Sequence, residues 1–151
     1  MEPQNIIILY AEDNEHDIIA TQRAWKKHKI KNSLYIVRNG EECLDFLNHR
    51  GEYEDLSSSP RPDLLLLDLN MPRMGGLEVL REMRATPELK DLHVVVLTTS
   101  SADQDKVKSY DLGVMGYILK PVGFENFALA IRAINIYWVL VSDRPVDYGA
   151  A

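Results

Sequence analysis

Four apolar runs of this sequence are each followed by a reactive or ion-binding side chain. The acids Glu12 and Asp13 follow the first run, Asp68 follows a later one, and Thr98 and Lys120 follow two more. Three carboxylates held together repel one another, and a hard divalent cation such as Mg²⁺, or Mn²⁺ in its place, relieves that repulsion. A carboxylate can also attack phosphorus to form an acyl phosphate, whose oxygens a lysine and a hydroxyl can bind. These residue types therefore predict a metal-assisted site for a phosphoryl group.

Each of these features, taken alone, has a simpler structural explanation. Glu12 and Asp13 would favour the positive end of a following helix, while Thr98 and Lys120 are ordinary at a strand end and a turn. Asp68 is harder to explain in this way, because an acid placed directly after a run of leucines is costly to bury without a partner. Acids, a hydroxyl and an amine that follow four separate apolar runs are unlikely to occur together by chance. We therefore interpret the set as one functional site.

The apolar runs are short and continuous, and stretches with helical spacing separate them. Runs without polar interruption indicate strands that are buried on both faces, as in a parallel sheet. The predicted strands span residues 6–10, 34–37, 64–67, 94–97 and 117–119. The predicted helices run from Asn14 to Lys29, from Gly40 to Leu47, from Gly76 to before Thr86-Pro87, from Asp103 to Leu112 with Gly113 as the cap, and from Phe124 past Trp138.

This alternation of strand and helix predicts an α/β fold. Five repeats imply right-handed crossovers and a doubly wound, five-stranded parallel sheet with helices on both faces, although the pattern leaves the strand order open. In such a sheet the functional groups gather at the carboxyl ends of the strands. We find no linker or repeat, so we expect residues 1–151 to form a single domain, and the polar, proline-flanked segment 50–62 to be an exposed loop.

Composition narrows the function classes. The chain has 151 residues, 46% of them hydrophobic, and a formal net charge of -6, which favours one well-packed domain and argues against binding to a nucleic-acid backbone. The single cysteine, Cys43, cannot form an internal disulfide and is interpreted as a buried reduced thiol. The first apolar run is too short for a signal peptide or a membrane span, so we expect a soluble, cytoplasmic protein with no membrane contact.

The same residues resemble the receiver domains of bacterial two-component response regulators. The pair Glu12-Asp13 is similar to the family's metal-binding acids, and Asp68 followed by Asn70-Met71-Pro72 is similar to its phosphoacceptor segment. Thr98 and Lys120-Pro121 resemble the switch threonine and the phosphate-binding lysine, Tyr117 the aromatic switch residue, and Gly76 a loop glycine. The likeness covers roughly residues 5–135, with residues 136–151 as a C-terminal extension. It implies the flavodoxin-like strand order 2-1-3-4-5 in a three-layer α/β/α receiver.

The resemblance also implies a role for each site residue. Asp13, Asp68 and the Asn70 carbonyl would ligate Mg²⁺, and Glu12 would act through water. A phosphohistidine on a sensor histidine kinase would transfer its phosphoryl group to Asp68. Lys120, the Thr98 hydroxyl and the Thr99 amide would bind phosphoryl oxygens, while Tyr117 would move inward. Such a protein is a two-state switch rather than an enzyme for external substrates.

One position departs from the family's commonest pattern. A small residue usually follows the switch threonine, whereas Thr99 adds β-branched bulk, which predicts slower attack by water and a longer-lived phosphorylated state. The run Thr98-Thr99-Ser100, the long 50–62 loop and the aromatic-rich fifth helix together resemble single-domain response regulators of bacterial and cyanobacterial phytochrome histidine kinases.

Two other functions compete with this interpretation. An aspartyl-phosphate phosphohydrolase would need a second acid two residues after its nucleophile, and that position is Asn70 here. A receiver-like binding module that is never phosphorylated would be expected to lack a functional position, and none is missing. We therefore expect a phosphoacceptor that signals through protein contacts, with no room left for a DNA-binding or catalytic output domain.

The end of the predicted fifth helix is apolar on every side. Residues 133–141 carry no charge, and a helix of this kind needs a cover. We expect homodimerisation through the fifth helix and its extension, with exchange of the strand-prone segment 137–141 as one route and a tail folded back on its own domain as the alternative. The predicted contact residues are Phe127, Ile131, Ile134, Trp138 and Leu140.

Overall fold

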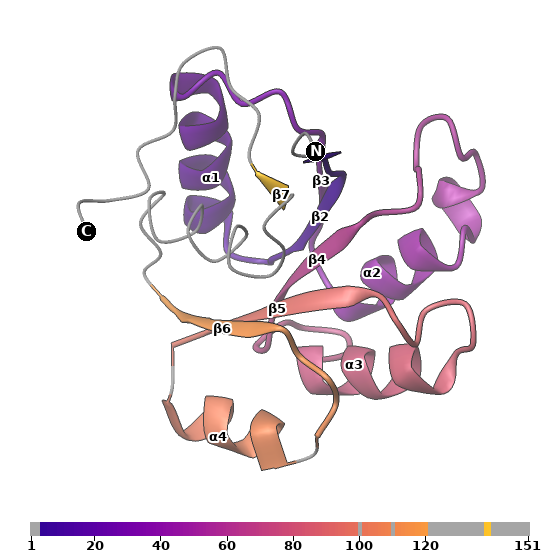
Figure 1. Ribbon diagram of the computed structural model, residues 1–151, viewed down its shortest axis with the longest axis vertical. Coiled ribbons are helices and arrows are strands. Elements are labelled where there is room, and N and C mark those ends of the chain that lie inside the picture. The colour runs from indigo at the N-terminus through magenta and orange to yellow at the C-terminus, as the bar shows by residue number, and fades with distance from the viewer. Residues whose placement is uncertain (1–3, 100, 110, 121–137, 140–151) are drawn as a thin grey trace.

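The computed structural model describes residues 4–99, 101–109, 111–120 and 138–139. Its centre is a parallel sheet of five strands (Figure 1). The strands are β2 (Ile8–Ala11), β3 (Leu34–Val37), β4 (Leu64–Asp68), β5 (His93–Thr98) and β6 (Gly116–Leu119). They lie in the order β3-β2-β4-β5-β6, which is the predicted order 2-1-3-4-5. The doubly wound α/β fold is therefore confirmed.

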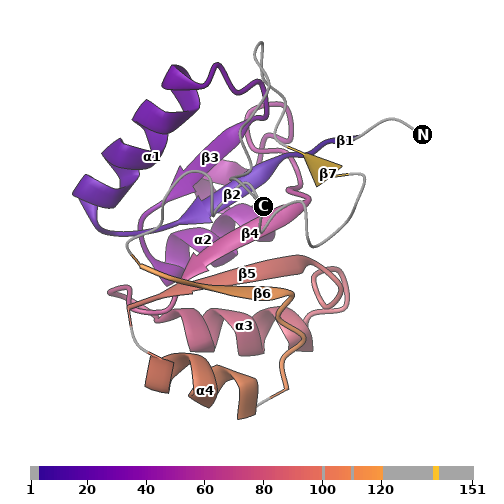
Figure 2. The same cartoon turned by 60° about the vertical axis from the view of Figure 1, so that its left-hand side comes forward.

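Four helices of the described chain cover the two faces of this sheet. They are α1 (Glu15–Lys27), α2 (Gly40–Leu47), α3 (Gly76–Ala85) and α4 (Ser101–Ser109), and a 3-10 turn, η1 (Gly51–Tyr53), follows α2. Helix α1 packs on one face, while α2, α3 and α4 lie on the other (Figure 2). Three layers result, as predicted.

Asparagine side chains cap the first two helices at their N-terminal ends. The Asn14 side chain accepts a hydrogen bond from the Asp17 amide at 3.1 Å, and Asn39 accepts one from the Glu42 amide at 2.9 Å. Each bond satisfies an amide that has no partner within the helix. Helix α3 ends because Thr86, which precedes a proline, takes an extended conformation.

Alternating residues of the strands supply two separate hydrophobic clusters. In β4, Leu65 and Leu67 join the cluster under α2 and α3, whereas Leu64 and Leu66 join the cluster that contains Trp25 of α1. Strand β5 divides its side chains in the same way. Burial on both faces is the physical reason for the unbroken apolar runs. Cys43 lies in the first cluster and is fully buried, as predicted.

The C-terminal part of the chain differs from the prediction of a continuous fifth helix. Trp138–Val139 forms a short strand, β7, which pairs in parallel with β1 (Gln4–Asn5) in a separate two-stranded sheet. A helix that continues past Trp138 is therefore wrong, because these strand-prone residues pair with the start of the chain instead. Phe127, Ile131, Ile134 and Leu140 lie outside the described residues.

Helix α4 and the 50–62 segment also differ from the prediction. Helix α4 begins at Ser101 rather than at Asp103, and it ends earlier than predicted because the chain turns at Asp111, whose φ is 50°, before it reaches Gly113, whose φ is 68°. The 50–62 segment is mostly exposed, but Ser59 and Pro62 are buried, so it is not solvated throughout. Among the described residues, no helix is both long and apolar enough to cross a membrane.

Candidate functional site

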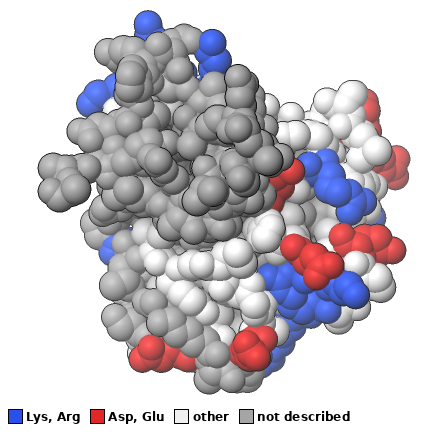
Figure 3. Space-filling view, viewed as in Figure 1, with Lys and Arg blue, Asp and Glu red and all other residues white. Residues whose placement is uncertain are grey.

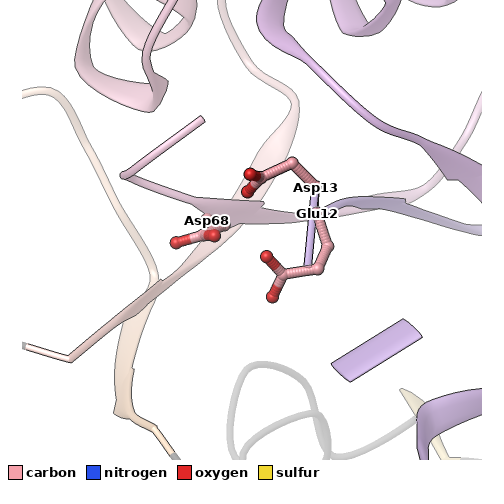
Figure 4. A group of neighbouring side chains, drawn as sticks. All are labelled: Glu12, Asp13 and Asp68. Atoms are coloured by element: carbon pink, nitrogen blue, oxygen red, sulfur yellow. The ribbon is translucent and has the colours of Figure 1, made fainter. Parts of the chain in front are cut away.

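Three carboxylates meet at the carboxyl edge of the sheet. Strands β2 and β4 pair with Ala11 opposite Leu67, so the residues that follow them emerge side by side. Carboxylate oxygens of Glu12, Asp13 and Asp68 all lie within 4.8 Å of one another (Figure 4). Sheet register therefore brings together acids that are more than fifty residues apart in the sequence.

Burial sets the electrostatics of Glu12. Its side chain is fully buried, whereas Asp13 is exposed and Asp68 is 4% exposed. Burial first, and then the neighbouring Asp68, raise the pKa of Glu12 to about 7, although Lys120 opposes the shift. The Tyr10 hydroxyl donates a hydrogen bond to Glu12 Oε1 at 3.3 Å, and burial raises the pKa of that phenol. Glu12 therefore binds a proton more readily than an exposed glutamate does.

Lys120 brings a positive charge into the same edge of the sheet. Its Nζ contacts Glu12 Oε1 and lies 3.1 Å from Asp17 Oδ2 and 3.2 Å from Asp68 Oδ2. The Lys120 amide donates to the Thr98 carbonyl at 2.8 Å, which ties its backbone to the end of β5. Burial alone would lower the pKa of Lys120, but the contacts with Glu12, Asp68 and Asp17 raise it overall. The ammonium therefore stays charged throughout the physiological range.

The other predicted site residues surround this centre in different environments. Thr98 is buried at the end of β5, and Thr99, directly after it, is exposed. Tyr117 lies on β6 opposite Val96 and is partly buried against the hydrophobic cluster under α2 and α3. Asn70 is exposed, and its amide donates to Asp68 Oδ1 at 3.2 Å. Asp68 and Thr98 thus end neighbouring strands at the carboxyl edge of the sheet, whereas Tyr117 lies two residues before the end of β6.

The loop after Asp68 is held close to the strand end. The Gly76 amide donates to the Leu69 carbonyl at 3.0 Å, and a Cβ at Gly76 would lie 2.6 Å from the Asp68 carbonyl oxygen. Across the loop, a Cβ at Gly40 would lie 2.2 Å from the Met74 carbonyl oxygen. Glycine is required at both positions because backbone meets backbone there.

Comparison with known proteins identifies the family. A model of the response regulator receiver domain matches residues 8–132. The chain belongs to the response regulator receiver family. Response regulator Rcp1 of Synechocystis sp. is 40% identical over 133 residues, which cover 88% of each chain. The structure of the Mn²⁺-bound form of Rcp1 superposes with a TM-score of 0.71 at 39% identity, covering 93% of this chain and 99% of that one.

Two further solved structures are similar. Bacteriophytochrome response regulator RtBRR gives a TM-score of 0.81 at 37% identity, covering 96% of this chain and 86% of that one. The phosphorylated cyanobacterial phytochrome response regulator RcpA gives 0.68 at 42% identity, covering 80% of this chain and 84% of that one. This receiver is thus a response regulator of two-component signalling, close to phytochrome-associated ones.

The donor set of the receiver's acidic cluster suits a hard divalent cation. Carboxylate oxygens are the ligands that Mg²⁺ and Mn²⁺ prefer, and the three acids offer such oxygens within 4.8 Å of one another. Burial and then the neighbouring Asp68 raise the pKa of Glu12, and a cation would offset the repulsion from Asp68. The residues present therefore fit a divalent metal site.

Two residues near this receiver's site have roles that the sequence did not reveal. Asp17 contacts Lys120 from α1, but an acid in the first helical turn already has a favourable explanation in the helix dipole. Tyr10 points its hydroxyl to Glu12, but it ends an apolar run and was expected only in the core. Asp17 lies in the first turn of α1, and no pattern in the sequence indicates that it faces Lys120.

The receiver's surface over α2 and α3 carries both signs of charge. Acidic and basic side chains are interspersed there on the face seen in Figure 3. One such pair is Arg73 with Glu41, which joins the loop after Asp68 to the start of α2 at 2.6 Å, with both side chains mostly exposed. This face therefore does not present the basic stripe typical of nucleic-acid binding.

Proposed function

We propose that Asp68 of this receiver accepts a phosphoryl group from a phosphohistidine of a sensor histidine kinase of the phytochrome type. The phosphorus–nitrogen bond of the phosphohistidine breaks as a bond forms between phosphorus and an Asp68 carboxylate oxygen. The imidazole leaves as the neutral base after taking up a proton from solvent. The product is an acyl phosphate on Asp68, and it makes the receiver a switch rather than an enzyme for external substrates.

The observation that carries this proposal is the position of Lys120 beside Asp68. An ammonium 3.2 Å from the accepting carboxylate can bind an oxygen of the arriving phosphoryl group, because that group adds oxygens at the same point. Asp68 is 4% exposed and its strand neighbours are apolar, so water competes weakly for the contact. The phosphorylated state of RcpA, at 42% identity, supports the same chemistry.

Asp13, Asp68 and the Asn70 carbonyl would hold Mg²⁺, or Mn²⁺ in its place, with Glu12 acting through water. The cation would supply positive charge that offsets the phosphoryl oxygens. Rcp1 has a Mn²⁺-bound form, which supports this assignment. Asp13 is the exposed member of the cluster and Glu12 the buried one, so Asp13 is the acid better placed for direct ligation from solvent.

Thr98 and Tyr117 are proposed to report the phosphorylated state to the surface. The Thr98 hydroxyl and the Thr99 amide would bind phosphoryl oxygens. Tyr117 would then move inward, into the space that the Thr98 side chain vacates when it turns toward the phosphoryl group. The partial burial of Tyr117 supports this role, because a side chain at the edge of the core can move without opening a buried cavity. Output would then pass through a protein contact made by this surface.

The partner is tested by phosphotransfer from a panel of purified sensor histidine kinases. We expect transfer from a phytochrome kinase to be the fastest, and to change with the light state of that kinase. Kinases from unrelated systems serve as the matched controls. Equal transfer from all of them would contradict the phytochrome assignment while leaving Asp68 as the acceptor.

Slow hydrolysis is a further expectation of the proposed site. Thr99 is exposed beside Thr98, so its β-branched side chain can shield the acyl phosphate from water. Thr99→Ala should therefore shorten the lifetime of phosphorylated Asp68. Thr99→Val keeps the branch and is the matched control. No acceleration in the alanine variant would contradict this role.

We also propose that the chain, a receiver core of about residues 5–135 with an extension at 136–151, forms a homodimer through its C-terminal part. In the structure β7 pairs with β1 of its own chain, as in the alternative of a folded-back tail, and exchange would form the same pairing with β1 of a second copy. Light scattering should show a dimer for the full chain and a monomer after truncation beyond Asn135. A monomeric full chain at micromolar concentration would contradict the proposal.

A further inference from the structure

Lys120 has an acidic partner that the proposed phosphoryl chemistry does not use. Asp17 Oδ2 lies 3.1 Å from Lys120 Nζ, which also contacts Glu12 and lies 3.2 Å from Asp68 Oδ2. An ammonium group has three N–H donors. Three carboxylates therefore engage all the donors of Lys120 before any phosphoryl group arrives.

The three partners differ in exposure and in duty. The side chains of Glu12 and Asp68 are 0% and 6% exposed and belong to the carboxylate cluster. Asp17 is 41% exposed and lies outside that cluster. It is thus the partner of Lys120 that remains available when a cation and a phosphoryl group occupy the other two acids.

The backbone of Asp17 is fixed although its side chain is partly exposed. Its amide donates to the Asn14 side chain at 3.1 Å, within the N-terminal cap of α1. Lys120 is different, because a lysine side chain is long and loses much rotamer freedom when it is held in one place. A carboxylate on a capped helix turn can supply that restraint.

We infer that Asp17 is a positioning residue for the phosphorylation of Asp68. It holds the Lys120 ammonium beside Asp68, so that the ammonium is already in position to bind a phosphoryl oxygen when one arrives. When Asp68 becomes an acyl phosphate, a phosphoryl oxygen replaces the carboxylate oxygen as the acceptor, and the contact with Asp17 is kept. This inference rests on the proposed function and adds a residue to its machinery.

The expected effect is modest because Asp17 is partly exposed. Loss of a partly exposed ion pair corresponds to a slowing of roughly two- to fivefold. Salt screens such a pair, so the difference between wild type and variant should shrink as ionic strength rises.

The test measures the rate of Asp68 phosphorylation from phosphoramidate at saturating Mg²⁺ in full-length variants. Asp17→Asn should slow phosphorylation, and Asp17→Glu, which keeps the charge, should restore most of the rate. Glu15→Gln is the matched control, because Glu15 is an acid in the same helical turn that pairs with Arg38 at 3.2 Å instead of Lys120. It should leave the rate close to that of wild type.

A double-mutant cycle shows whether Asp17 acts through Lys120. In a Lys120→Met background, Asp17→Asn should cause no further slowing. The ¹⁵N resonance of the Lys120 ammonium gives a second readout, and it should shift in Asp17→Asn but not in Glu15→Gln.

Normal phosphorylation in Asp17→Asn, or equal slowing with and without Lys120, would overturn the inference while the proposed function stands. A wild-type chain that is not phosphorylated at all would overturn both.

Discussion

Gly76 is the residue whose substitution most directly tests how the site is built. It is the first residue of α3, and a Cβ there would lie 2.6 Å from the Asp68 carbonyl oxygen and 2.8 Å from Leu69 Cα. Ordinary van der Waals contact begins at 3.4 Å, so Gly76→Ala has a shortfall of about 0.8 Å against backbone atoms. Neither atom can rotate away as a side chain would, and the strand end that carries Asp68 must shift.

The magnitude follows from two opposing effects. Overpacking of this kind costs about 1–3 kcal/mol. Replacing glycine restricts the unfolded chain and returns about 0.4–1 kcal/mol. We therefore expect Gly76→Ala to be destabilised by roughly 1–2 kcal/mol, which lowers Tm by roughly 3–6 °C for a domain of this size. The shift of Asp68 should also slow its phosphorylation in protein that is still folded.

Thermal unfolding with a matched control measures this effect. Gly75→Ser adds a Cβ at the neighbouring residue, where the nearest atom is the Leu69 carbonyl oxygen at 3.3 Å, and it also provides a side-chain cap for α3. Its Tm should stay within about 2 °C of wild type. A Gly76→Ala variant as stable as Gly75→Ser would refute the close approach of α3 to the Asp68 strand end.

Three other perturbations have defined outcomes. The Glu12 pKa is raised to about 7, so protons should compete with Mg²⁺ for the acidic cluster. The affinity for Mg²⁺ measured by calorimetry should fall between about pH 8 and about pH 6, less steeply in Glu12→Gln, and a pH-independent affinity would contradict the shift. Burial raises the pKa of Cys43 to about 12, so iodoacetamide should modify it only after unfolding, and rapid labelling of the native chain would show that the thiol is accessible. Asn39→Ala removes the cap of α2 and should cost about 1 kcal/mol in urea unfolding, whereas Asn48→Ala at the other end of α2 should cost less; equal losses would contradict the cap.

The sheet and most of the site could be predicted because local sequence carries their signal. Residues 64–67 are all leucine since both faces of β4 are buried, and that constraint is visible without the fold. The acids and Lys120 come directly after such runs, so parallel pairing necessarily brings them to one edge. The prediction of the acidic cluster required only that the strands be parallel.

Features that depend on distant partners could not be predicted. The contact between Asp17 and Lys120 joins residues 103 positions apart, and nothing in the first turn of α1 indicates that its acid points toward a lysine. The strand β7 exists because Trp138 and Val139 pair with Gln4 and Asn5, while their own sequence equally fits a helix. In both cases a contact with a distant residue decides between two structures that the local sequence allows equally well.

The central claim is that Asp68 is the phosphoacceptor, with a divalent cation held by the acids beside it. It is tested by incubating the wild-type chain and Asp68→Asn with a phosphorylated histidine kinase, with and without Mg²⁺, and mapping the label by mass spectrometry. We predict Mg²⁺-dependent labelling of wild type at Asp68 and none at that position in Asp68→Asn. Labelling of the variant at the same site, or undiminished labelling of wild type after removal of divalent cations, would contradict the account.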